Sequence, residues 1–390
     1  MLQYFLFNYY GYYIIFLFLF LFSILSCFNK KKEIKYFIIF SIIVSFFMIF
    51  RFDLEFDYVW YWIVGDERFQ GYWFYNFAYE RVGIFFKFLF KLTRLSGNPK
   101  MFFIITGIIF SFLFLKSINK YAKNKFMAMI IYFYLPSLYF TFLIGFIRQG
   151  LAIISCFFIT DLLYKKKYLL YIFLIILISL FIHKSALVCI LYVVIYKINN
   201  KKYLLLLESI IFFLVLNLEI ILKGIPLLKD YTYYLQENLN FSFLGLKIAM
   251  VAGILYIFTC FLIKVNNLKL SKEDKFYNNL IIFGIGLFIL LTIKIGGHVP
   301  MRVSSYFFIF FPIFFSNTFS YLRKKRIIEL LLIIFLFLFS NFNLMRIANK
   351  EYKKIDFRNS WHFKLLLFND YEDLAGKYIP GGKVEYEYKK

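Results

Sequence analysis

The chain has 390 residues, of which 62% are hydrophobic and 24% are aromatic, and its formal net charge is +24. Ordinary soluble domains are roughly 45–50% apolar, so this composition excludes a cytosolic enzyme, a nucleic-acid-binding protein and a disordered chain. At about 20 residues per crossing, the apolar residues suffice for about twelve transmembrane helices. The composition therefore predicts an all-α fold, a polytopic helix bundle integral to a membrane.

Apolar runs follow one another along the chain as far as residue 345. The predicted spans are 9–28, 36–50, 101–116, 126–145, 150–164, 168–183, 185–197, 203–222, 244–263, 277–295, 303–321 and 327–345. The largest interruption is the segment 51–100, between the second and third spans. We therefore predict a transmembrane domain over 1–345 that contains this sizeable extracytoplasmic loop, followed by a mixed-charge extracytoplasmic tail over 346–390.

The basic residues indicate how the spans are oriented. They form short bursts between apolar runs, at 30–35, 116–125, 165–167, 197–202, 264–275 and 323–326. Cytoplasmic loops of membrane proteins are enriched in Lys and Arg, and all six bursts lie on the cytoplasmic side when the amino terminus is placed outside. The high positive charge thus indicates membrane orientation and anionic lipid headgroups rather than nucleic acid.

The segment 82–95 of the long loop has the pattern of a helix that lies flat on a membrane. Lys87, Lys91 and Arg94 are three or four residues apart among apolar residues. This spacing places the cations on one face of a helix and leaves an apolar face opposite. We therefore predict an interfacial helix on the outer surface.

Two arginines stand at predicted outer ends of spans. Arg148 lies beside Gln149 in the sequence FIRQGLA, and Arg302 opens a later span, with Tyr306 one helical turn further on the same face. A guanidinium binds a phosphate through two parallel hydrogen bonds, and a helix start adds the positive end of its dipole. The alternative is that each arginine only anchors a helix end in the headgroup region. Together the two predict a clamp for a diphosphate group.

Three residues are candidates for taking a proton from an attacking hydroxyl. His183 ends a span in the sequence LFIHKSAL, and its ordinary pKa of about 6.5 suits that task, although a histidine there is as often only structural. Asp57 and Glu80 of the outer loop are the rival bases. Many carboxylates of this loop are expected to be solvated or paired with arginines. Spacing alone leaves the choice open.

The sequence predicts neither a cofactor nor a metal site. It contains no glycine-rich nucleotide-binding motif. The four cysteines all lie in apolar runs without C-x-x-C spacing, as expected of buried thiols rather than metal ligands or disulfides. The acidic cluster at 53–57 is the one alternative that has suitable oxygen ligands.

The polar residues of the chain also form an ordered series of short motifs. Its members are Arg51, Asp57, Tyr58 and Tyr61; Tyr79, Glu80 and Gly83; Arg148, Gln149 and Ala152; His183, Ser185, Ala186 and Leu187; and Arg302 and Tyr306. Over roughly residues 36–320 this series resembles the EpsG/Wzy-type polysaccharide polymerases. The first span and the tail after 346 carry no such motif.

The resemblance implies a multi-pass glycosyltransferase of the bacterial cytoplasmic (inner) membrane, with its active site on the extracytoplasmic side. Such proteins transfer a growing glycan from its undecaprenyl diphosphate carrier to a lipid-linked repeat unit, building O-antigen, capsule or exopolysaccharide. The implied partners are the undecaprenyl-diphosphate-linked donor and acceptor, membrane lipids and a possible chain-length-regulating protein, without nucleic acid. Because the donor is activated by its lipid, no nucleotide sugar is required.

The same resemblance suggests a role for each candidate residue. The diphosphate and glycan are expected to contact Arg148, Gln149, Arg302, Tyr306, Arg51 and Tyr61, with Arg51 orienting Asp57. The acceptor hydroxyl is activated by His183, or else by Asp57 or Glu80. No metal takes part in this interpretation.

Two other classes of protein remain as alternatives. One is a related enzyme, an O-antigen ligase or another polyprenyl-phosphate-dependent glycosyltransferase. A ligase is expected to have its large outer loop late in the chain, whereas here it comes early, at 51–100. The other is a lipid-linked oligosaccharide flippase or transporter, which typically has broken helices and charges near the middle of the bilayer.

Overall fold

The computed structural model shows a helical protein. It describes residues 2–52, 61, 64, 79, 82–134, 146–198, 201–217, 243–294, 299–321, 326–354 and 364–365. In chain order the elements are α1 (Leu2–Phe28), η1 (Lys30–Lys32), α2 (Glu33–Ile49), β1 (Arg51–Phe52), α5 (Ile84–Leu95), α6 (Lys100–Tyr121), α7 (Lys125–Tyr134), α8 (Ile147–Phe158), α9 (Asp161–Tyr164), α10 (Tyr168–Phe181), η4 (Lys184–Ile190), α11 (Leu191–Lys197), α12 (Lys201–Leu216), α15 (Phe243–Val265), α16 (Lys272–Lys294), α17 (Val299–Phe308), α18 (Phe311–Tyr321), α19 (Arg326–Lys354) and β2 (Lys364–Leu365).

The helices coincide with the apolar runs of the sequence. Five segments of the described residues are long and apolar enough to cross a membrane, and further apolar helices are shorter. The prediction of a helical membrane protein is therefore confirmed, while the number of twelve spans stays a prediction.

Three predicted spans differ from the expected single α-helices. The span 150–164 is divided into α8 and α9, the span 185–197 begins as the 3-10 helix η4, and the span 303–321 is divided into α17 and α18. Pro312 explains the last break, because proline lacks an N–H and its ring clashes with the carbonyl four residues earlier. That carbonyl belongs to Phe308, the last residue of α17.

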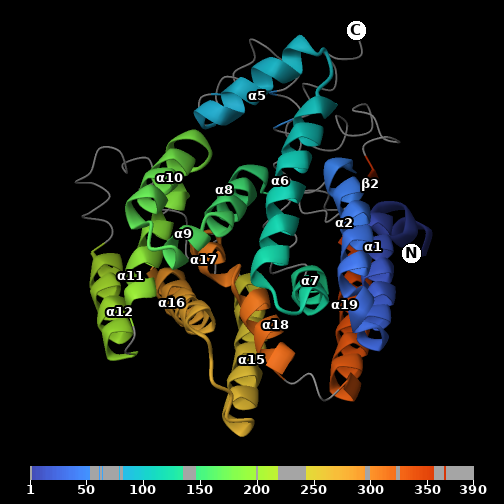
Figure 1. Ribbon diagram of the computed structural model, residues 1–390. Helices are drawn as coiled ribbons and strands as arrows, with labels where there is room; N and C mark the ends of the chain where they lie inside the picture. The colour runs from blue at the N-terminus through green and yellow to red at the C-terminus, as the bar shows by residue number, and fades with distance from the viewer. Residues whose placement is uncertain are drawn as a thin grey trace.

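The two ends of the molecule differ in character (Figure 1). Helix α5 lies across the upper end, whereas the α1–α2 and α15–α16 connections lie at the lower end, where basic bursts of the sequence occur. Helix α2 packs closely on α6 because Gly107 has no side chain, and a Cβ there would come within 2.6 Å of Ile49 Cα. Small residues of this kind allow close approach of helices in membranes.

Helices α17 and α18 are deeply buried, and every residue of 304–319 is buried. The outer helices instead expose rows of apolar side chains. On α2 the row consists of Ile34, Ile38, Ile42 and Phe46, at intervals of four residues. Because backbone groups of a helix bond internally, such a helix can face lipid with its apolar side chains.

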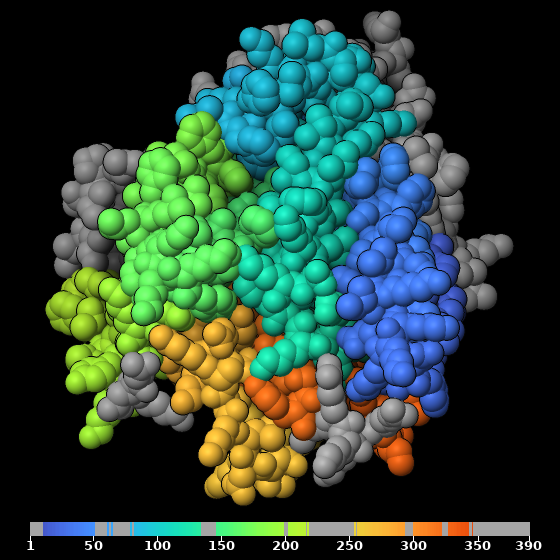
Figure 2. All heavy atoms as spheres, in the orientation of Figure 1, coloured from blue at the N-terminus to red at the C-terminus, as the bar shows by residue number. Residues whose placement is uncertain are grey.

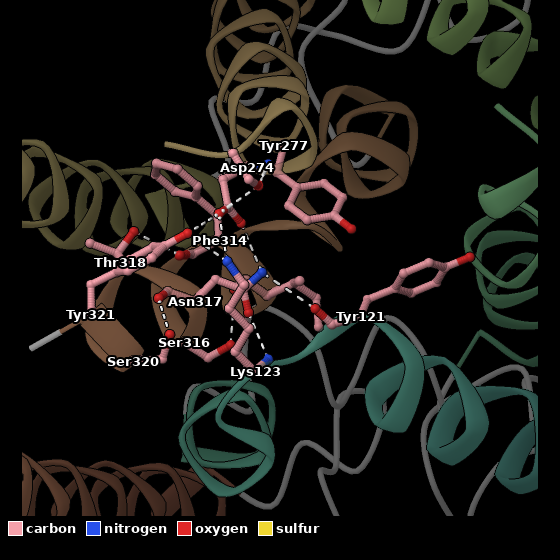
Figure 3. A network of polar contacts seen from close by, with 12 residues as sticks. Tyr121, Lys123, Asp274, Tyr277, Phe314, Ser316, Asn317, Thr318, Ser320 and Tyr321 are labelled. Atoms are coloured by element: carbon pink, nitrogen blue, oxygen red, sulfur yellow. Dashed lines mark hydrogen bonds and ion pairs between the residues drawn. The ribbon is translucent and has the colours of Figure 1, made fainter. Parts of the chain in front are cut away.

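A polar network joins three helical segments at the lower end (Figure 3). Asp274, near the start of α16, is 1% exposed. Its carboxylate accepts hydrogen bonds from Asn317 Nδ2 (2.8 Å), Ser271 Oγ (2.9 Å), Tyr321 Oη (3.0 Å) and Lys123 Nζ (3.1 Å). The backbone N–H of Lys123 also donates to Asn317 Oδ1, at 2.8 Å. The network thus ties the α6–α7 turn to α16 and α18.

The two predicted segments outside the spans are described in part. The segment 82–95 contains α5, whose buried residues Phe86, Leu89, Phe90 and Thr93 lie on one face; its position on a membrane surface stays a prediction. Helix α19 continues beyond the predicted span end at 345 to residue 354. Strand β2 of the tail then pairs antiparallel with β1.

Candidate active site at the end of the bundle near α5

Three helical segments that are distant in sequence meet near α5. They are the start of α8, the turn between α10 and η4, and α17, and all three pack on one another. Gly83, before α5, lies against this turn, because a Cβ there would be 2.5 Å from the carbonyl oxygen of Phe181. The start of α5 is thereby in close contact with the segment that leads from α10 to His183.

Arg148 lies in the first turn of α8 and is partly buried. Its Nε donates a hydrogen bond to Tyr61 Oη at 3.0 Å. The Tyr61 ring is 4% exposed and stacks on Phe102 of α6, with ring centroids 5.2 Å apart. A residue of the long loop is thereby fixed against the predicted phosphate-binding arginine.

The start of α8 has no side-chain cap from the residue that precedes it. Phe146, the residue before the helix, provides no side-chain cap, so the first N–H groups have no partner from that side chain. Backbone donors and the helix dipole together favour an anion at such a position. Arg148 is therefore placed where a negatively charged ligand is already favoured.

Arg302 in α17 is held beside the start of α8. Its guanidinium carbon lies 4.6 Å from the centroid of the Phe146 ring, and its backbone oxygen accepts a hydrogen bond from Gln149 Nε2. Its Nε is buried and has no hydrogen-bond partner among the described residues. Because a buried donor of a charged group is costly to leave unpaired, this atom indicates a missing acceptor.

His183 and Tyr306 are linked through Ser185. The Ser185 hydroxyl lies 2.6 Å from His183 Nδ1 and 2.9 Å from Tyr306 Oη, and the backbone N–H of Ser185 also donates to Nδ1 at 3.3 Å. Tyr306 is fully buried, and its backbone oxygen accepts a hydrogen bond from Tyr192 Oη of α11. The chain of hydroxyl groups therefore joins the turn that bears His183 to the helix that bears Arg302.

The charges of the two arginines act on His183. The structure ends helix α10 at Phe181, earlier than the predicted span end at residue 183, so His183 lies in the turn beyond that helix. Burial, and then the positive charges of Arg148 and Arg302, lower the pKa of His183 from 6.5 to about 3. Both arginines are thus close enough to repel a proton on the imidazole, which is neutral at physiological pH.

Replacing His183 by asparagine is expected to weaken the pH dependence of stability. Asparagine retains a side-chain acceptor for the N–H of Ser185 but has no titratable proton. Because the folded-state pKa of His183 is lowered, the unfolded chain binds a proton below pH about 6.5 that the folded chain excludes, and stability is lost as the pH falls. Between pH 7 and pH 5, the melting temperature of the wild type in detergent should fall a few degrees more than that of His183→Asn. Equal decreases would contradict the burial of a neutral ring.

The structure brings together six of the predicted site residues, namely Tyr61, Arg148, Gln149, His183, Arg302 and Tyr306. Arg51 belongs to β1, where it pairs with Leu365 of β2. Asp57 and Glu80 lie outside the described residues. Their roles as bases and the role of Arg51 in orienting Asp57 therefore stay predictions.

Three further residues belong to this site, and none of them had a predicted role. Ser185 appeared in the motif series only as a neighbour of His183. Its position two residues after His183 was nevertheless a usable signal of contact between the two side chains. Tyr192 and Phe146 are aromatic residues in an aromatic-rich chain, so composition concealed them. Their positions depend on contacts between segments distant in sequence.

The fold and the site define a multi-pass helical membrane protein with a cluster of arginine, histidine and hydroxyl groups near one end of the bundle. The chain belongs to the EpsG family, whose model matches residues 37–357. This is a family of Wzy-like polysaccharide polymerases, so the chain is a polysaccharide polymerase in the general sense. No curated protein and no solved structure matches it.

Proposed function

We propose that the protein transfers a growing glycan from undecaprenyl diphosphate to the non-reducing end of a lipid-linked repeat unit, on the outer face of the cytoplasmic membrane. The acceptor hydroxyl attacks the anomeric carbon of the donor glycan and forms the new glycosidic bond. The bond from that carbon to the diphosphate breaks, and undecaprenyl diphosphate leaves with the electron pair. The acceptor proton passes to a base of the protein.

The single observation that carries this proposal is the buried Nε of Arg302 beside the start of α8, which has no hydrogen-bond partner among the described residues. The guanidinium of Arg302 comes from α17, and Arg148 and the start of α8 come from a second segment. Preorganised donors of this kind stabilise negative charge as it develops on a leaving group. A departing diphosphate is the ligand that fits this set, because it brings both the charge and several acceptor oxygens.

The hydrogen bonds of His183 suggest how its ring acts. Its Nδ1 accepts the backbone N–H of Ser185 and therefore carries no proton. In the neutral ring the proton must then be on Nε2, so the ring presents a donor there. We infer that His183 first donates a hydrogen bond through Nε2 to an oxygen of the diphosphate or of the sugar.

Proton removal from the acceptor then falls to a carboxylate of the long loop. Asp57 precedes Tyr61 by four residues, and Glu80 follows Tyr79 directly. The Tyr61 hydroxyl is bonded to Arg148, and the Tyr79 ring lies 5.2 Å from the guanidinium carbon of Arg94 in α5. Along the sequence, both carboxylates are therefore close to a tyrosine that the structure anchors at this end of the bundle.

Replacing Ser185 by alanine is expected to slow elongation by about 10-fold or more, the scale on which hydrogen-bond partners that orient metal-bound histidines contribute in other proteins. The change removes the hydroxyl between His183 and Tyr306 but retains the backbone N–H bond. The control is Ser209→Ala in α12, which removes an exposed hydroxyl that bonds only within its own helix. Both rates are measured at equal protein abundance, and equal rates would exclude a positioning role for Ser185.

The proposed function is tested by reconstituting the purified protein in liposomes with a radiolabelled lipid-linked repeat unit. We expect longer glycans that remain attached to the carrier, together with released undecaprenyl diphosphate. A product on a non-lipid acceptor would instead indicate a ligase. Movement of the unextended substrate between leaflets, without elongation, would indicate a flippase and overturn the proposal.

A further inference from the structure

A polar cavity lies at the opposite end of the bundle from Arg302. It has a volume of about 550 Å³ and is lined by residues of α11, α15 and α16. Figure 2 shows the surfaces of α15 and α16, in yellow and orange, at the lower end of the molecule, away from α5 at the upper end. The cavity is thus separate from the candidate active site.

Three lysines surround this cavity. Lys264 lies near the end of α15, and Lys272 and Lys275 lie in the first turn of α16. Among the described residues, none of the three forms an ion pair with a carboxylate. The nearby Asp274 is already bonded to Lys123 and Asn317 on the other side of α16. Glu273 stands between Lys272 and Lys275 in sequence but pairs with neither among the described residues, so three lysines against one exposed carboxylate leave an excess of positive charge at the cavity.

The walls of the cavity are held by hydrogen bonds. Tyr256 Oη donates to Asn278 Oδ1 at 2.8 Å, which joins α15 to α16. Asn279 Nδ2 donates to the carbonyl oxygen of Ile198 at 3.3 Å, which joins α16 to the end of α11. The Nζ of Lys272 lies 4.8 Å from the centroid of the Tyr196 ring. The cations are therefore presented by a connected frame of three helices.

The surface beside the lysines is strongly apolar. Three apolar side chains of α15 are largely exposed, namely Ile257 (68%), Phe261 (58%) and Val265 (60%). The first two precede Lys264 on the helix, and Val265 directly follows it. Such exposure in a membrane protein is expected of a surface in contact with acyl chains. A ligand bound here would therefore contact both cationic and apolar groups of α15.

We propose that this cavity binds a phosphate-bearing anion, and that its source is the headgroup of an anionic phospholipid. Ammonium groups and asparagine amides supply donors for phosphate oxygens, while the apolar face of α15 suits the acyl chains. Basic pockets between membrane helices hold lipid headgroups in this way. The proposal concerns a different end of the molecule and does not depend on the polymerase mechanism.

The first test uses the full-length wild-type protein and a photoactivatable phosphatidylglycerol in phosphatidylcholine nanodiscs. After illumination, crosslinked peptides are mapped by mass spectrometry. We expect enrichment of crosslinks in 256–279, and competition by unlabelled phosphatidylglycerol but not by added phosphatidylcholine. Crosslinks distributed evenly over the basic bursts would overturn the proposal, because they would indicate only general attraction of anionic lipid.

The second test compares two triple variants with the same change of charge. Lys264→Gln/Lys272→Gln/Lys275→Gln alters the cavity, whereas Lys31→Gln/Lys32→Gln/Lys35→Gln alters exposed lysines at the α1–α2 connection. We expect at least a 10-fold weaker affinity for phosphatidylglycerol only in the cavity variant. Equal losses in both would overturn the proposal.

A parallel titration with inorganic pyrophosphate distinguishes the two sources of phosphate. Binding of phosphatidylglycerol that depends on the cavity lysines, with weak binding of pyrophosphate, supports the lipid headgroup. The reverse order of affinities retains the anion site but overturns the lipid as its source. Absence of both, in a wild-type protein that is monodisperse on gel filtration, overturns the site.

Discussion

Replacing Arg302 by alanine is expected to reduce the rate of glycan elongation by about 100-fold or more, with normal protein abundance. Removing one preorganised donor from a site that stabilises developing negative charge costs about 10²–10³ in rate. Arg302 supplies a full positive charge as well as the buried Nε that has no partner among the described residues. The measurement is the length distribution of lipid-linked glycans over time in proteoliposomes.

The substitution Arg302→Lys separates charge from geometry. Lysine retains the positive charge but not the planar fork that binds two phosphate oxygens at once, so an intermediate rate is expected. Lys91→Ala on α5 is the matched control, since it removes one exposed cation from the same end of the molecule. If Arg302→Ala and Lys91→Ala elongate equally, the diphosphate clamp is wrong.

Replacing Asp274 by alanine is expected to have the largest effect on stability. Leaving a buried hydrogen-bond donor without its partner costs about 1–3 kcal/mol, and the amide of Asn317, at 2% exposure, is such a donor. The buried Asn317 amide would retain only its bond to the carbonyl oxygen of Tyr121, and Lys123 would lose its ion pair while retaining its bond to Tyr321 Oη. The expected result is a strongly lowered melting temperature and reduced abundance in membranes.

The neighbouring Glu273→Ala is the control for this experiment. Glu273 lies in the same first turn of α16, and its substitution removes the same charge, but its side chain is exposed. Its effect is expected to be within about 0.5 kcal/mol, as for most surface substitutions. Similar melting temperatures for the two variants would show that the network of Figure 3 does not stabilise the bundle.

The substitutions Asp274→Ala and Arg302→Ala should therefore have different effects, the first on stability and the second on the reaction rate. Helix α16, which bears Asp274, packs closely on α17, which bears Arg302. Loss of Asp274 is expected to lower the amount of folded protein, while the surviving molecules elongate at close to the normal rate. Loss of Arg302 is expected to do the opposite. Measuring the rate per folded molecule distinguishes the two effects.

The polar residues of the site were accessible from sequence for a simple reason. A charged side chain is costly within a membrane, so each arginine or histidine in an apolar run needs an explanation. This argument identified Arg148, His183 and Arg302, which the structure places around one cluster. It assigned no partner to any of them, because partners lie in other segments of the chain.

The breaks between helices were less predictable. Pro312 is a visible signal for the division between α17 and α18, but the apolar run continues through it without a change in composition. The 3-10 helix η4 likewise follows His183 in an apolar segment. Hydropathy reports the free energy of transferring side chains from water to lipid, and this free energy is nearly the same for α- and 3-10 helices.

The sequence by itself determined that this protein is helical and inserted in a membrane. The free energy of transferring apolar side chains out of water is a sum over the residues of the chain, and it requires no tertiary contact. It also identified which charged residues required a function. Only the tertiary structure decided that Ser185 joins His183 to Tyr306, that Gln149 supports Arg302, and that one donor of Arg302 is buried without a partner among the described residues. Those features depend on hydrogen-bond distances between segments more than 100 residues apart, and such distances are fixed by how the helices pack.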